Sequence, residues 1–245
     1  MSRTFRSISA KNALNTYFSR SLISTAYSIS TRRRLHVHAE AARPTDSEQR
    51  IATPNLPNFS DSLSQHLNQT FKPLKFPPAL AQRILTHLSH RDSVIGHNSR
   101  FAFLGRRTLE AYLLLFLQGL PAAADHDHSR IVARVLNTHT LGEHVTPHWK
   151  LQDVMRWTPP RAADLGFDGR TAGLHKVAGT MVEAVVGGVL HQFGGSVAHR
   201  LFHTRMLPHL LLPGSPLGLP DVLHPDALKA AERYGGTEGP LTRSP

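Results

Sequence analysis

The sequence contains no cysteine, which excludes disulfide bonds and cysteine metal sites. It also lacks an apolar run of the roughly 18 residues that a membrane-spanning helix needs. The longest candidate, residues 112–117, predicts buried core, so we expect no membrane span. With 245 residues, 40% of them hydrophobic, the chain can form one substantial core with irregular ends, or two small domains.

Acidic residues are absent from positions 1–39, which hold seven of the 28 basic residues. This stretch is rich in serine and arginine, and its apolar residues recur at roughly helical spacing. The pattern predicts a mitochondrial transit peptide over 1–40, cleaved between Arg32 and Ala42, and hence a place in the mitochondrial matrix. A basic arm that touches RNA directly is the alternative. The rest of the chain holds 21 basic against 17 acidic residues, a net charge of +4, which by itself does not establish RNA binding.

The remaining chain divides by composition into three parts. Residues 41–75 are polar and interrupted by proline, which predicts an extended arm or linker. Residues 76–207 follow a helical pattern, with no alternating strand pattern and no internal repeat, so the expected fold is all-α. Residues 208–245 form a tail rich in Pro and Gly, with one short helix expected over 227–234. The other predicted helices cover residues 79–88, 98–117, 130–139, 151–157, 175–193 and 197–207.

Three ordered segments carry the most specific pattern in the sequence. They read Leu-Thr-His-Leu-Ser at 85–89, Asn-Ser-Arg-Phe-Ala-Phe-Leu-Gly-Arg-Arg-Thr-Leu at 98–109, and Gly-Thr-Met-Val-Glu-Ala-Val-Val-Gly-Gly at 179–188. They resemble the motifs of the ribonuclease III family, and the resemblance covers roughly residues 77–206. The positions that match in register are Asn98, Arg100, Phe103, Leu104, Gly105, Glu183, Ala184 and Gly187. The resemblance implies the helical ribonuclease III-like endonuclease-domain fold.

The residues themselves agree with two helices over the second and third segments. The side chain of Asn98 is expected to cap the first helix by accepting an amide hydrogen bond. A glycine inside a helix costs about 1 kcal/mol relative to alanine. Gly105, Gly187 and Gly188 therefore predict places where two helices pack closely.

Ribonuclease III enzymes hold Mg²⁺, which prefers oxygen ligands, with four carboxylates from these two helices. Here the four positions carry Ala102, Arg106, Thr180 and Glu183, so a single carboxylate remains. We therefore expect a degenerate domain, a pseudoenzyme without catalytic residues, metal or cofactor. Glu183 is expected to form a buried salt bridge with Arg106 or Arg107, although a retained metal role is the alternative.

A closer resemblance rests on residues 137–145, Trp149 and residues 153–159. These are similar to the fungal mitochondrial large-subunit ribosomal proteins of ribonuclease III type, specifically to the shorter kind, which lacks a double-stranded-RNA-binding domain. The resemblance implies a structural place in the mitochondrial large ribosomal subunit, in contact with mitochondrial rRNA and other subunit proteins. It also implies a heterodimer with the longer paralogue through the signature helices.

Candidate contact residues follow from these expectations. The interface candidates are Phe101, Leu104, Thr108 and Tyr112, each of which could equally be core. The candidate RNA contacts are Arg100, Arg107, His199, Arg200 and His203. His199 and His203 share a helix face, but no metalloprotease glutamate accompanies them, so we interpret them as surface or RNA-facing.

Two other functions stay open at this point. One is an active metal-dependent endoribonuclease that cleaves double-stranded RNA, which would need the missing acids. The other is a mitochondrial RNA-processing or maturation factor that holds RNA without being part of the ribosome. The sequence barely separates the second from the ribosomal interpretation.

Overall fold

The structure, a computed structural model, describes residues 59–159 and 173–242, which lie in one compact unit over Thr53–Pro245. The predicted transit peptide over 1–40 lies outside the described residues. The α-helices are α1 Phe59–Thr70, α2 Pro78–Ile84, α3 Ser99–Gln118, α4 His128–Val135, α5 Thr138–His144, α6 Thr146–Trp149, α8 Leu174–Phe193, α9 Gly195–Leu201 and α10 His224–Glu232. The described part of the chain contains no strand, in agreement with the predicted all-α class.

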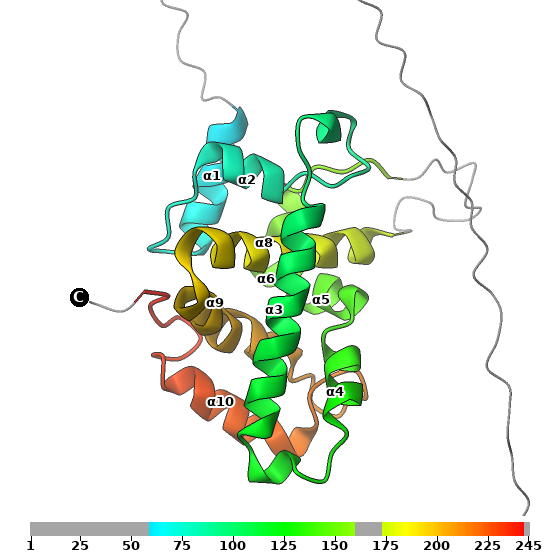
Figure 1. Ribbon diagram of the computed structural model, residues 1–245, viewed down its shortest axis with the longest axis vertical. Coiled ribbons are helices and arrows are strands. Elements are labelled where there is room, and N and C mark those ends of the chain that lie inside the picture. The colour runs from blue at the N-terminus through cyan, green and yellow to red at the C-terminus, as the bar shows by residue number, and fades with distance from the viewer. Residues whose placement is uncertain (1–58, 160–172, 243–245) are drawn as a thin grey trace, which may run out of the picture. The chain divides into compact units, whose positions relative to one another are not determined.

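Helices α3 and α8 cross at the centre of the unit, and the other helices surround this crossing (Figure 1). Glycine allows the two backbones to meet. A Cβ atom on Gly105 would lie 1.8 Å from the carbonyl oxygen of Glu183, and one on Gly187 would lie 2.0 Å from that of Phe101. The close helix packing predicted from these glycines is confirmed.

A second glycine pair joins α5 to α8. A Cβ atom on Gly142 would lie 1.8 Å from the carbonyl oxygen of His175, and one on Gly179 would lie 1.8 Å from that of Thr138. No helical pattern in the sequence marks this pair, because Gly142 stands alone in a short segment. It brings the start of α5 against α8, which places Thr138 near Glu183.

Helix α1 differs from the extended arm that we expected over 41–75. Leu63, Leu67 and Phe71 follow each other at intervals of four and are buried, so this segment packs one apolar face against the body. No proline falls between Pro57 and Pro73, which leaves room for the helix. Residues 41–58 lie outside the described part.

Asn98 does not cap α3 through its side chain, contrary to our expectation. The side chain is buried, and its Nδ2 donates to the sulfur of Met181 at 3.1 Å. Its backbone N–H donates to the carbonyl of Thr86. Helix α2 likewise ends at Ile84 instead of continuing to residue 88, because Thr86 forms a parallel bridge with Arg156.

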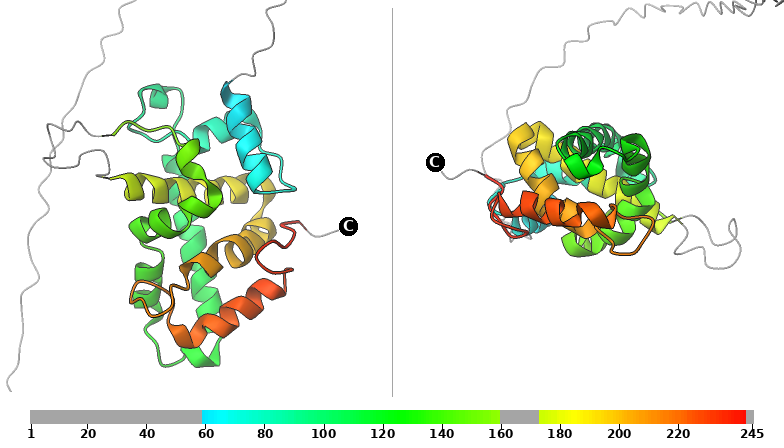
Figure 2. Two further views of the ribbon diagram at one scale, coloured as in Figure 1. Left: turned by 180° about the vertical axis from the view of Figure 1, so that it is seen from behind. Right: turned by 90° about the horizontal axis from the view of Figure 1, so that it is seen from below.

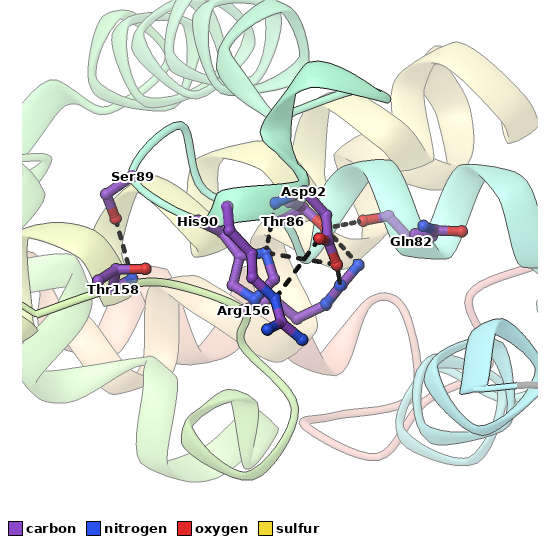
Figure 3. A network of polar contacts seen from close by, with 8 residues as sticks. Gln82, Thr86, Ser89, His90, Asp92, Arg156 and Thr158 are labelled. Carbon is purple, nitrogen blue, oxygen red and sulfur yellow. Dashed lines mark hydrogen bonds and ion pairs between the residues drawn. The ribbon is translucent and has the colours of Figure 1, made fainter.

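A polar network holds the segment between α2 and α3 (Figure 3). The 3-10 turn Arg91–Val94 presents Asp92 to the guanidinium of Arg156, which also donates to the hydroxyl of Thr86. Arg156 lies in the segment that follows the 3-10 turn Leu151–Asp153, where we predicted a helix over 151–157. The network therefore ties two segments that lie far apart in the sequence.

The C-terminal part packs back on the body. A π-helix, Phe202–Met206, follows α9 and leads into a 3-10 turn, Leu207–Leu210, and Figure 2 shows α10 alongside this region. The short helix predicted over 227–234 is confirmed as α10, and Gly235 and Gly236 adopt positive φ after it. Within residues 59–159 and 173–242, no helix is long and apolar enough to cross a membrane.

Candidate functional site

The side chains of Arg106 on α3 and Glu183 on α8 meet beside the helix crossing. Arg106 Nη2 donates to Glu183 Oε1 at 2.7 Å and also to the hydroxyl of Thr138. Thr138 in turn donates to the same carboxylate oxygen at 3.1 Å. The predicted buried salt bridge is thus confirmed with Arg106 as the partner, whereas Arg107 pairs with Glu110 at 2.7 Å.

Burial and charge act on Glu183 in opposite directions. Its side chain is 5% exposed, against 39% for Arg106. Burial raises the pKa of Glu183, while the Arg106 charge and the hydrogen bond from Thr138 lower it and do not fully offset burial. The 2.7 Å contact to a guanidinium nevertheless stabilises the ionised carboxylate, so we assign Glu183 as charged at neutral pH.

A pocket of about 280 Å³ opens beside this ion pair, between α3, α4, α5 and α8. Its charged and titratable lining groups are Arg106, Glu110, His139 and Lys176. Arg106 is paired with Glu183, and Glu110 is paired with Arg107, so the net positive charge of the lining comes from Lys176. Such a pocket suits an anion.

The magnesium ion implied by the family resemblance does not fit this arrangement. Ala102 is buried and has no side-chain oxygen, and the Thr180 hydroxyl donates to the carbonyl of Lys176 at 3.0 Å. Oε1 of Glu183, the one carboxylate left at these four positions, already accepts hydrogen bonds from Arg106 and Thr138. Among the described residues, no three His, Cys, Asp or Glu side chains gather in a way that could hold a metal ion.

The five candidate RNA contacts differ in burial: two are exposed, two are partly buried and one is buried. Arg100 and Arg107 are exposed on α3. Arg200 is partly buried, where its guanidinium lies 5.1 Å from the ring centroid of Tyr234. His203 is buried, with 5% exposure, which differs from the surface position that we expected.

The burial of His203 follows from its place in the π-helix. Its ring packs against Phe116 and Phe202, and its Nε2 lies 3.2 Å from Nε2 of His199. Burial, followed by the nearby His199, lowers the pKa of His203 to about 4, and burial also lowers the pKa of His199. The pair is therefore held neutral inside the fold and carries little charge toward RNA.

The interface candidates lie mostly within the chain's own packing. Phe101 is 8% exposed, and Thr108 is equally buried and donates to the carbonyl of Leu104. Leu104 and Tyr112 are partly buried. The large apolar side chains that α3 exposes are instead Phe103, Leu115 and Leu114, at 66%, 65% and 36%. Helical periodicity places Phe103 opposite the buried Gly105 face, so the spacing of these two residues alone predicts that Phe103 is exposed.

Comparison with known proteins agrees with the fold. A Ribonuclease-III-like family model matches residues 77–210. Ribonuclease 3 of Cupriavidus taiwanensis and that of Cupriavidus necator are each 29% identical over 151 residues, which is 61% of this chain. The match spans about half, 54%, of the length of these relatives.

A solved structure shows the same fold. The nuclease domain of ribonuclease III from Campylobacter jejuni superposes with a TM-score of 0.50 at 18% identity, covering 62% of this chain and 97% of that domain. These findings contradict our expectation that the chain is not an enzyme: the relatives are named Ribonuclease 3, the structure is a nuclease domain, and nothing in the comparisons shows a degenerate member. Because the family model matches more than half of the sequence, the chain belongs to the ribonuclease III-like family.

Proposed function

We propose that this chain binds the phosphate backbone of structured RNA through the pocket beside Arg106, as a constituent of the mitochondrial large ribosomal subunit. The observation that carries the proposal is the guanidinium of Arg106, which lies between the helices at the position of a family carboxylate, with Lys176 and His139 around the same pocket. A guanidinium and an ammonium recognise phosphate oxygens directly. RNA helices are recognised largely by shape and by contacts to phosphate and 2′-hydroxyl groups.

The setting in the ribosome rests on the sequence. The acid-free N-terminal 39 residues suit mitochondrial import, and residues 137–145 and 153–159 carry the resemblance to mitochondrial large-subunit proteins. In the structure, residues 138–144 form α5, which contributes Thr138 and His139 to the Arg106 pocket. The segment with the closest resemblance is thus part of the proposed RNA-binding site.

The proposal includes pairing with a second domain of the same family. Phe103 and Leu115 are exposed on α3, and Val94 and Ile95 before α3 are 91% and 77% exposed. Single exposed apolar residues are ordinary, but a group of large ones is typical of protein interfaces. A longer paralogue is the partner that the sequence resemblance favours, and other large-subunit proteins surround the pair.

RNA binding is tested with a duplex RNA in buffer without divalent ions. Lys176→Gln removes a pocket charge from an exposed side chain and is expected to weaken binding at every sequence tested, with a shallower salt dependence. Lys229→Gln, on α10 and outside the pocket, is the matched control and should bind like the unaltered chain. Equal affinities for both variants would contradict the proposed pocket.

A second candidate function is endoribonuclease activity on double-stranded RNA, which the names of the relatives favour. The test is incubation of duplex RNA with Mg²⁺ or Mn²⁺ and analysis of the products. Cleavage that disappears in the Glu183→Gln variant supports this function. RNA that stays intact while it remains bound supports the binding role alone.

A further inference from the structure

A second basic cavity lies in a different part of the described body, among α1, α6, the turn Leu207–Leu210 and the C-terminal segment. Its volume is about 460 Å³. The titratable side chains that line it are His66, His148, Lys150, Arg205, His209 and Glu238. Glu238 is the one acidic group among these lining residues, so the cavity is cationic. It shares no lining residue with the Arg106 pocket.

Arg205 is the central cation of this cavity. Its side chain is 15% exposed and its Nε is buried without a hydrogen-bond partner in the structure. Nη1 contacts Glu238 Oε2 at 2.5 Å, whereas the Glu238 side chain is 90% exposed. The largely buried guanidinium of Arg205 is therefore neutralised by the solvent-exposed carboxylate of Glu238. An ion pair with one solvated member gains little net energy, so an added anion can compete for the arginine.

The histidines complete a surface suited to an oxyanion. The rings of His148 and His209 stack with centroids 3.7 Å apart. Burial, and then the neighbouring His148, lowers the pKa of His209 to about 4, so this ring is neutral at pH 7 and offers an N–H donor without a competing charge. Lys150, held in the left-handed conformation at the end of α6, is exposed at the same cavity.

From this geometry we propose that the cavity around Arg205 binds a phosphate group, and that Glu238 occupies the anion's place when no phosphate is bound. The C-terminal segment does not depend on Glu238 for its position. Arg205 Nη2 donates to the carbonyl of Gly239 and Arg200 Nη1 donates to that of Pro240, while Leu241 is fully buried. Replacing the carboxylate alone therefore leaves the segment in place and frees the arginine.

The test uses the full chain and inorganic phosphate, followed through the imidazole NMR signals of His148 and His209. Phosphate should shift both signals in a saturable way, and chloride at equal ionic strength should not. Glu238→Gln should tighten phosphate binding about fivefold, the effect of one unit charge at contact distance in water. Lys150→Gln should weaken it by a similar factor, and Lys229→Gln, outside the cavity, should leave it unchanged. Shifts that do not saturate, or that chloride reproduces, would overturn the proposal.

A second arm identifies the source of the phosphate. If the cavity binds a phosphate group of RNA, a short RNA duplex added to the phosphate complex should displace inorganic phosphate and keep the His148 and His209 signals shifted. If the cavity binds a free phosphate compound, the duplex should not displace inorganic phosphate. Because inorganic phosphate reports on this cavity directly, failure of RNA binding at the Arg106 pocket does not affect the result.

Discussion

The carbonyl oxygen of Glu183 lies 1.8 Å from the point where a Cβ atom on Gly105 would stand, and the carboxylate of the same Glu183 is bound by Arg106, the next residue of α3. One residue of α8 thus contacts two successive residues of α3, through its backbone and through its side chain. The ion pair therefore lies directly beside the closest approach of the two helices. Helix packing and site geometry are consequences of the same contact.

Gly105→Ala should destabilise the fold strongly, because the added methyl group meets backbone and cannot be relieved by a side-chain rotation. We expect a loss of about 3 kcal/mol in the free energy of unfolding, at the upper end for overpacked positions. Urea unfolding measures it. Gly195→Ala is the control, since its Cβ would lie 3.6 Å from the Tyr112 hydroxyl, an ordinary contact. Similar losses in the two variants would contradict the close helix contact.

Arg106→Asp should destabilise the protein by about 3 kcal/mol, because it leaves the buried Glu183 carboxylate unpaired beside a like charge. Thermal unfolding measures the change. Arg107→Asp removes an exposed ion pair with Glu110 and should cost about 1 kcal/mol or less. A melting temperature that is unchanged by Arg106→Asp would show that the pairing contributes nothing to stability.

Stability should fall as the pH is lowered from 7 toward 4. The pKa of His203 and that of His209 are depressed to about 4 in the folded state, so between the ordinary value of 6.5 and 4 the unfolded chain binds more protons. Each group can contribute a slope of up to about 1.4 kcal/mol per pH unit in this window. Denaturant unfolding at several pH values between 6.5 and 4 measures this slope.

His203→Phe should reduce this slope, since the ring lies among aromatic side chains and the variant has no proton to bind. His126→Gln, at an exposed position, is the control and should preserve the slope. Stability that is flat between pH 6.5 and 4 would contradict the buried neutral histidines.

Asp92→Ala should loosen the segment between α2 and α3, because Arg156 loses the carboxylate that it contacts (Figure 3). We expect a loss of about 1.5 kcal/mol, as for a hydrogen bond to a charged group, and faster amide exchange over residues 87–97. Asp226→Ala, in a more open pair with Lys229 at 3.6 Å, should change stability by about 0.5 kcal/mol or less. Unchanged exchange over 87–97 in Asp92→Ala would count against the network's role.

Short-range patterns predicted much of the fold. Amphipathic spacing predicted α3 and α8. The glycines inside them predicted close packing, because glycine lowers the stability of a helix and a favourable contact must offset that loss. The Arg106–Glu183 pair followed from the motif positions, although the choice between Arg106 and Arg107 needed the structure.

The failures concern contacts between distant segments. The side chain of Asn98 could cap the N-terminus of α3, but in the folded chain it is buried and donates to the sulfur of Met181. His203 has a polar side chain at helical spacing, but the π-helix turns it toward Phe116. The cavity around Arg205 joins residues from 66 to 238, and no local pattern could have gathered them.

The central claim is tested most directly by sedimentation of mitochondrial ribosomes in a high-salt gradient, with the chain detected in each fraction. The proposed ribosomal role predicts that the chain migrates with the large subunit in a one-to-one ratio and stays there as the salt is raised. Its recovery in light fractions alone would contradict that role.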